Sequence, residues 1–109
     1  MHSTLIVARM NPASSTSVAK IFEEFDKSEM PGLMGTVTRQ LFHYRGLYFH
    51  LQEFESADRA SSIEKMKSHP SFVRISSDLE PFISAYDPDT WRSPSDAMAT
   101  RFYHWTQSS

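Results

Sequence analysis

The stretch RQLFHYRGLYFHLQE, residues 39–53, decides the fold of this chain. It predicts a β-hairpin, because two runs rich in aliphatic and aromatic residues flank Arg45-Gly46. Glycine readily takes the positive φ that a two-residue hairpin turn needs. With Tyr44 opposite Leu47, the register of the whole hairpin from about 35 to 54 follows.

The hairpin has two chemically different faces, because opposed residues share a face and successive residues alternate. One face gathers the polar and titratable groups: Val37, Arg39, Leu41, His43, Tyr48, His50 and Gln52. The other face carries Thr38, Gln40, Phe42, Tyr44, Leu47, Phe49, Leu51 and Glu53. We expect helices to cover this second, more apolar face, and the first face to line a ligand cavity.

The segments before the hairpin read as a strand and a helix. Residues 4–10 (TLIVARM) predict a strand that ends at the turn signal Asn11-Pro12. Residues 14–29 predict an amphipathic helix, whose serine and threonine cluster can cap its start. Met30-Pro31-Gly32 is expected to end it. The apolar stripe of this helix consists of Val18, Ile21, Phe22 and Phe25.

After the hairpin the periodicity is again helical. Ala60, Ile63 and Met66 predict a second helix that ends near Ser68-His69-Pro70, and Pro70 suits the first position of a further helix. The stripe of that further helix is Phe72, Ile75, Leu79 and Phe82. Residues 84–97 predict a connection rich in proline and aspartate. Residues 98–106 (MATRFYHWT) alternate like a final strand.

This order, β-α-β-β-α-(α)-β, predicts an α+β fold of the ferredoxin-like split βαβ type, in one domain spanning 1–109. Its antiparallel sheet would carry helices on one face only. An aromatic-rich chain should not leave the other face in water, so we expect a homodimer that covers it.

Composition excludes several classes of function. The net charge is -2 and the charges are mixed, which argues against nucleic-acid binding. The longest apolar run, LIVA, cannot span a membrane, and the N-terminus does not resemble a secretion signal. With no cysteine, no metal-like histidine spacing, no phosphate-binding glycine loop and no G-x-S-x-G turn, we expect a cytoplasmic protein without metal or cofactor.

The candidate site residues are ambiguous one at a time. Arg39 alone is best explained as a surface arginine and His50 as a packed histidine, but both share a face with Tyr48 and Gln52, which favours a ligand site. His43 lies near the turn and is expected to be exposed.

Two charged residues outside the hairpin are also candidates. Asp26 continues the stripe of the first helix, either as a helix-end group at the rim or as an inward carboxylate. Arg9 lies near its strand end with the same ambiguity. For Trp91, Tyr103 and Trp105, core or interface is favoured over pocket.

Five motifs carry a family resemblance: RMNP at 9–12, MPGLMGTVTRQLFHYRGLYFHLQE at 30–53, SHPSF at 68–72, LEPFISAYDPDTW at 79–91 and FYHW at 102–105. Together they resemble the small aromatic polyketide cyclases of the tetracenomycin F2 cyclase type, which also occur in spore-pigment clusters. The resemblance runs nearly end to end. It implies a homodimeric α+β barrel, with a pocket between sheet and helices in each subunit.

The resemblance also implies a reaction and its residues. The reaction is a cofactor-free aldol-type ring closure of a poly-β-ketone, with Arg39, His50 and Asp26 at the family's pocket positions. Phe25 stands where the tetracenomycin-type enzyme has a histidine, and Val37 replaces another pocket arginine. Both departures make the substrate-binding surface less polar.

From these residues we expect His50, with an ordinary pKa near about 6.5, to exchange a proton while Arg39 holds an enolate. Asp26 would orient His50 or a water, or carry a second proton. Tyr48 and Gln52 would bind carbonyl oxygens. Two alternatives remain: a cofactor-free monooxygenase of the antibiotic-biosynthesis type that oxidises an anthrone-like ring, and a non-catalytic polyketide-binding subunit or chaperone.

Overall fold

The hairpin has the predicted register in the computed structural model, which describes residues 2–56, 65–92 and 94–107. Strand β2 (Thr36–Tyr44) pairs antiparallel with β3 (Leu47–Phe54). Arg45 and Gly46 have φ values of 50° and 83°, the pair of positive angles that a type I′ turn needs. A register shift between Thr36 and Thr38 makes Val37 the extra residue of a β-bulge.

The sheet has the antiparallel order β2-β3-β1-β4. Strand β1 (His2–Met10) is central, and the short β4 (Ile83–Ala85) forms the other edge. The prediction that 98–106 supplies the last strand was therefore wrong. Only Met98 bridges to β1, opposite Ile6, and the residues after it have no regular structure up to 107. The predicted connection 84–97 instead begins with part of this edge strand and contains the short helix η2 (Pro94–Ala97).

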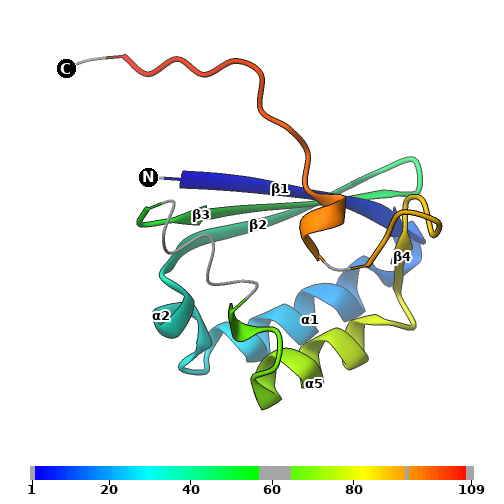
Figure 1. Ribbon diagram of the computed structural model, residues 1–109. Helices are drawn as coiled ribbons and strands as arrows, with labels where there is room; N and C mark the ends of the chain where they lie inside the picture. Colours follow the sequence, from blue (N-terminus) through cyan, green and yellow to red (C-terminus); the bar gives the residue numbers. More distant parts are fainter. Residues whose placement is uncertain (1, 57–64, 93, 108–109) are drawn as a thin grey trace.

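Helix α1 (Ser15–Asp26) and helix α5 (Pro70–Leu79) lie side by side under one face of the sheet (Figure 1). Pro70 occupies the start of α5, as predicted, and the His69 ring caps it by accepting from the Ser71 N–H over 3.1 Å.

The start and end of α1 differ in detail from prediction. Ser14, the N-cap residue of α1, makes no side-chain capping bond. The side chain of Asn11 caps the preceding turn η1 (Pro12–Ser14). After α1 ends, the predicted breaker Met30-Pro31-Gly32 starts a second short helix, α2 (Met30–Met34). Most of the helix predicted from Ala60, Ile63 and Met66 lies outside the described residues.

The assignment of the two sheet faces was wrong. The helices cover the face of Tyr48, His50 and Gln52, which are all buried, and not the more apolar face. Phe42 and Tyr44 on the other face are 50% and 60% exposed. No helix of the described residues covers this bare face (Figure 1). The main core cluster instead joins β1, β3, α1 and α5 through Ala8, Met10, Val18, Phe22, Tyr48 and Ile75.

Within the described ranges, no helix is both long and apolar enough to cross a membrane.

Candidate functional site

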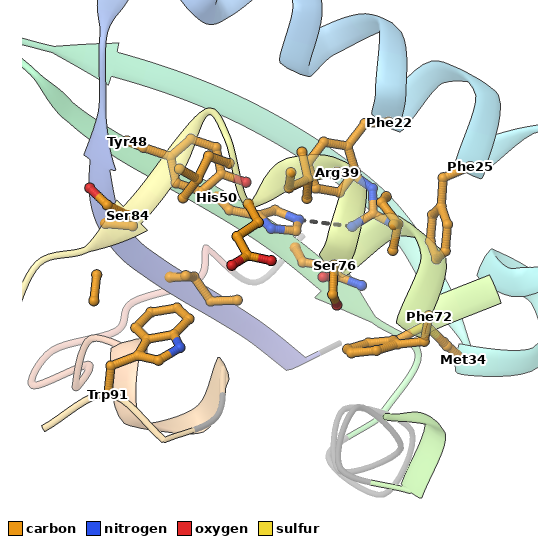
Figure 2. A pocket seen from close by; sticks show the side chains of 18 of the residues that line it. Phe22, Phe25, Met34, Arg39, Tyr48, His50, Phe72, Ser76, Ser84 and Trp91 are labelled. Atoms are coloured by element: carbon orange, nitrogen blue, oxygen red, sulfur yellow. Dashed lines mark hydrogen bonds between the residues drawn. The ribbon is translucent and has the colours of Figure 1, made fainter. Parts of the chain in front are cut away.

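A cavity of about 490 Å³ opens between the sheet and helices α1 and α5 (Figure 2). This is within the usual size range of small-molecule sites. Its floor is β3, where Tyr48, His50 and Gln52 project at every second position. Its walls are mostly apolar and come from α1, α2, α5, the β4 edge and the segment after it: Phe22, Phe25, Met34, Phe72, Ile75, Leu79, Ile83 and Trp91.

Arg39 is the buried charge of this cavity, with a side chain that is only 8% exposed. Its Nε donates to both oxygens of Asp26 at 3.1 Å. Its guanidinium carbon lies 5.0 Å from the centre of the Phe22 ring and 5.6 Å from that of Phe25. A carboxylate and two aromatic faces thus stabilise a cation that burial alone would disfavour.

One nitrogen of Arg39 has an ion-pair contact but no aligned hydrogen bond to a described residue. Nη2 is 3.0 Å from Asp26 Oδ1, but it is buried and makes no aligned hydrogen bond within the described part of the chain. A buried donor without an aligned hydrogen bond is costly, so this nitrogen is a candidate to bind a ligand oxygen.

His50 contacts the same guanidinium. Arg39 Nη1 lies 2.8 Å from His50 Nε2, and because a guanidinium has only donors, Nε2 must accept and the ring proton is on Nδ1. Burial, and then the charge of Arg39, lower the pKa of His50 to about 3. The expectation that His50 titrates near neutral pH was therefore wrong. The ring is neutral and presents an N–H, while its lone pair is already used.

Tyr48 and Gln52 flank His50 along the strand. Tyr48 is 3% exposed, and burial raises the pKa of its phenol, so it stays protonated. Its ring packs edge-on to His50, with centroids 6.2 Å apart. Gln52 is held by a 2.8 Å bond from its Nε2 to the Thr36 hydroxyl. Thr36 immediately precedes the bulge at Val37, so the bulge helps set the place of this amide.

The structure brings together six of the eight predicted site residues. Arg39, Tyr48, His50, Gln52 and Phe25 line the cavity, and Asp26 touches Arg39 from the end of α1 with a side chain that is 38% exposed. Asp26 contacts the arginine and not His50.

The other two predicted residues lie elsewhere. Val37 is 49% exposed in the bulge and does not line the cavity. Arg9 is also outside it, because its Nε donates to the Tyr86 carbonyl over 3.2 Å.

Sequence reasoning did not assign the α5 wall or Trp91 to the site. The stripe of Phe72, Ile75 and Leu79 was recognised, but a stripe that faces a ligand has the same period as one that faces a core. Trp91 lines the cavity, although core or interface had been favoured for it. Its position in a long irregular segment carries no periodic signal.

Comparisons with known proteins identify the family of this chain. The family model for polyketide synthesis cyclases matches residues 2–106. An uncharacterized protein of Streptomyces coelicolor is 49% identical over 109 residues, covering 99% of this chain and 97% of that protein. The polyketide synthase protein CurG of Streptomyces cyaneus is 44% identical over 105 residues, covering 96% of this chain and 97% of that protein.

A solved structure extends the likeness to the whole fold. Tetracenomycin F2 cyclase of Streptomyces glaucescens, described as a type-II polyketide cyclase, superimposes with a TM-score of 0.91. The superposition covers 99% of this chain and 100% of that chain at 33% identity.

Proposed function

Because this chain belongs to the polyketide synthesis cyclase family, we propose that it closes a ring in an aromatic polyketide precursor by an intramolecular aldol-type reaction. The substrate would be a poly-β-ketone or a partly cyclised intermediate of antibiotic or spore-pigment biosynthesis. The observation that carries the chemistry is the buried Arg39, whose Nη2 makes no aligned hydrogen bond in the described part of the chain and which lies beside a neutral histidine in an apolar cavity.

Arg39 stabilises the negative charge of the reaction. Ring closure needs an enolate at one carbon and an electrophilic carbonyl at another. Nη2 of Arg39, which has no aligned hydrogen bond among the described residues, offers a charged N–H to the enolate oxygen in a water-poor site, where such donors are strongest. Because the guanidinium remains charged at all physiological pH values, this contribution needs no proton transfer from the arginine.

His50 polarises the accepting carbonyl. Its Nε2 accepts from Arg39, so its Nδ1–H is the group left for an oxygen of the substrate. A neutral imidazole held by a second group can act as an electrophile of this kind. We therefore replace the expected role of His50 as a base with that of a hydrogen-bond donor.

Asp26 positions Arg39. Its two oxygens both accept from Nε, which fixes the guanidinium at the end of α1. With a side chain that is 38% exposed, Asp26 also stands where solvent water can exchange protons with it.

The proton balance needs no cofactor. A carbon between two carbonyls is acidic enough for water to take its proton. The enolate carbon forms a bond to the second carbonyl carbon, and the resulting alkoxide takes up a proton. Loss of that hydroxyl with a neighbouring proton, as water, then aromatises the ring. No electron is gained or lost in the sequence.

Orientation supplies much of the remaining effect. A flexible poly-β-ketone can close several rings, and the apolar walls of the cavity restrict which two carbons meet. Tyr48 and Gln52 offer a phenol and an amide to the other oxygens of the chain.

We also propose that the protein is a homodimer joined through its bare sheet face. Phe42 and Tyr44 leave large apolar areas exposed there, and Phe49 lies opposite Phe42 in the neighbouring strand. A second copy that presents the same face would cover these rings.

The decisive experiment incubates the purified protein with a reactive poly-β-ketone intermediate, in air and without oxygen, and follows products by mass. A product isomeric with the substrate, or lighter by one water, formed equally fast in both conditions, is expected. A product that gains oxygen only in air would make the protein a monooxygenase. Acceleration only when synthase partners are present would favour a binding subunit or chaperone.

A further inference from the structure

The segment that follows β4 forms a tight turn that presents Trp91. The Asp87 carbonyl accepts from the backbone N–H groups of Thr90 and Trp91, both at 3.2 Å. The Asp87 carboxylate accepts from the Asp89 N–H at 3.1 Å. These bonds are local, so the turn has its shape before any ligand arrives.

Trp91 lies at one end of the cavity. Figure 2 shows its ring across the cavity from Phe72 and Met34, with His50 and Arg39 above all three in this view. The residue is 36% exposed, and no described residue bonds to its indole N–H. An indole that is partly wet at a cavity mouth loses water contact, and gains contact area, when a flat molecule covers it.

Arg9 connects this segment to the central strand. Its Nε donates to the Tyr86 carbonyl over 3.2 Å, and its guanidinium carbon lies 4.5 Å from the centre of the Tyr86 ring. Tyr86 immediately precedes the Asp87 turn. Arg9, an ambiguous site candidate in the sequence, thus holds the start of the segment that carries Trp91.

We propose that the flat end of the substrate, remote from the reacting carbons, stacks on the ring of Trp91, and that Arg9 is a positioning residue that acts through Tyr86. The inference rests on the proposed function for the flatness of the ligand. Contacts with a remote part of a substrate can hold the reacting carbons at Arg39 and His50. Trp91 therefore contributes to which ring closes, as well as to affinity.

The test uses the two tryptophans of the chain as reporters, because Trp105 lies in the C-terminal segment and is 68% exposed. A stable trihydroxyanthraquinone serves as the flat ligand. Its Kd is measured by equilibrium dialysis for the unaltered protein, Trp91→Ala, Trp91→Phe and Trp105→Phe. We expect Trp91→Ala to raise Kd about tenfold and Trp91→Phe to restore most of the affinity. Trp105→Phe should leave Kd unchanged.

Fluorescence adds a contact-specific readout. In Trp105→Phe, which keeps only Trp91, the bound anthraquinone should shield the indole from acrylamide quenching. In Trp91→Phe, the remaining Trp105 should be quenched equally with and without the ligand. An unchanged Kd in Trp91→Ala, or a Trp91 that stays open to acrylamide in the complex, would overturn the stacking.

Arg9 is tested by the same signal. Arg9→Ala should make Trp91 more accessible to acrylamide in the free protein and raise Kd about threefold. Arg9→Lys should restore part of both, because lysine can still donate to the Tyr86 carbonyl but lacks the planar guanidinium that lies over the Tyr86 ring. A Trp91 signal that does not respond to Arg9→Ala would remove Arg9 from the proposal. This test is independent of the proposed ring closure. If the protein closed no ring, the anthraquinone could still bind and shield Trp91 from acrylamide.

Discussion

The two faces of the sheet have opposite relations between polarity and burial. On the helix-covered face, His50 and Gln52 are 6% and 2% exposed, although both are polar. On the bare face, Phe42 and Tyr44 are 50% and 60% exposed, although both are aromatic. Burying polar groups costs free energy unless they are fully paired, and Arg39 Nη2 is not. This reversal supports the two proposals that the covered face acts on a substrate and that the bare face contacts a second copy.

The largest effect should follow removal of the buried charge. Arg39→Ala takes away the proposed enolate donor and leaves His50 Nε2 without its partner. We expect kcat to fall by about 10²–10³, the usual range for one lost donor of this kind. Product formation followed by mass measures it. The control is Arg74→Ala, an exposed arginine of α5. Equal rates in Arg39→Ala and the control would remove Arg39 from the mechanism.

His50 should make the covered face sensitive to acid. Its pKa is lowered to about 3 in the folded protein, so between about pH 6.5 and 3 the unfolded chain binds more protons. The contribution of His50 to the free energy of unfolding is therefore complete above about pH 6.5. It falls by about 1.4 kcal/mol per pH unit as the pH drops toward about 3.

The non-titrating variant His50→Gln keeps an acceptor for Arg39 and isolates this effect. Urea unfolding at several pH values should show a shallower acid loss for His50→Gln than for the unaltered protein. His43→Gln, on the exposed part of β2, is the control. Parallel curves for the unaltered protein and His50→Gln would show that His50 is not the neutral, buried group described above.

A smaller effect on kcat is expected for Asp26, at the end of α1. Asp26→Asn keeps one acceptor for Arg39 Nε but removes the charge that holds it. We expect kcat to fall about tenfold with a nearly unchanged pH profile, because Asp26 positions the arginine. Steady-state rates across pH measure both. A loss as large as that of Arg39→Ala, with a shifted pH profile, would instead make Asp26 the proton carrier.

Substitutions on the bare face should have the smallest effect on kcat. Phe42→Ser and Phe49→Ser remove apolar area from the proposed dimer contact, so the dimer should dissociate at protein concentrations where the unaltered chain stays paired. Sedimentation velocity measures this, and kcat per folded subunit should stay within about twofold. If the sedimenting mass of both variants equals that of the unaltered protein, the dimer contact lies elsewhere.

The sequence predicted the hairpin register because a two-residue turn and a period of two leave little freedom. It did not predict which face the helices cover. Hydrophobicity favoured the face of Phe42 and Phe49, and that criterion fails when polar groups are buried for a ligand. A single chain also contains no record of a partner that would cover aromatic rings.

Other differences have local causes. Residues 98–106 alternate like a strand, but alternation describes only side chains and does not provide a neighbouring strand to pair with. Ile83–Ala85, which does pair with β1, is too short for any pattern to register. The contact between Asp26 and Arg39 joins residues 13 apart through the packing of α1 on the sheet, so only the place of Asp26 on the stripe at the end of that helix was predictable.

The separation of the reacting groups from the α5 wall has a consequence for engineering. Arg39 and His50 project from the sheet, whereas Phe72, Ile75, Ser76 and Leu79 project from one helix and shape the opposite side of the cavity. Exchanging side-chain volume along that helix would change the length and curvature of the polyketide that fits, while the guanidinium and imidazole keep their places. If the proposed roles of Arg39 and His50 hold, a library confined to those four positions would be a direct route to altered ring patterns.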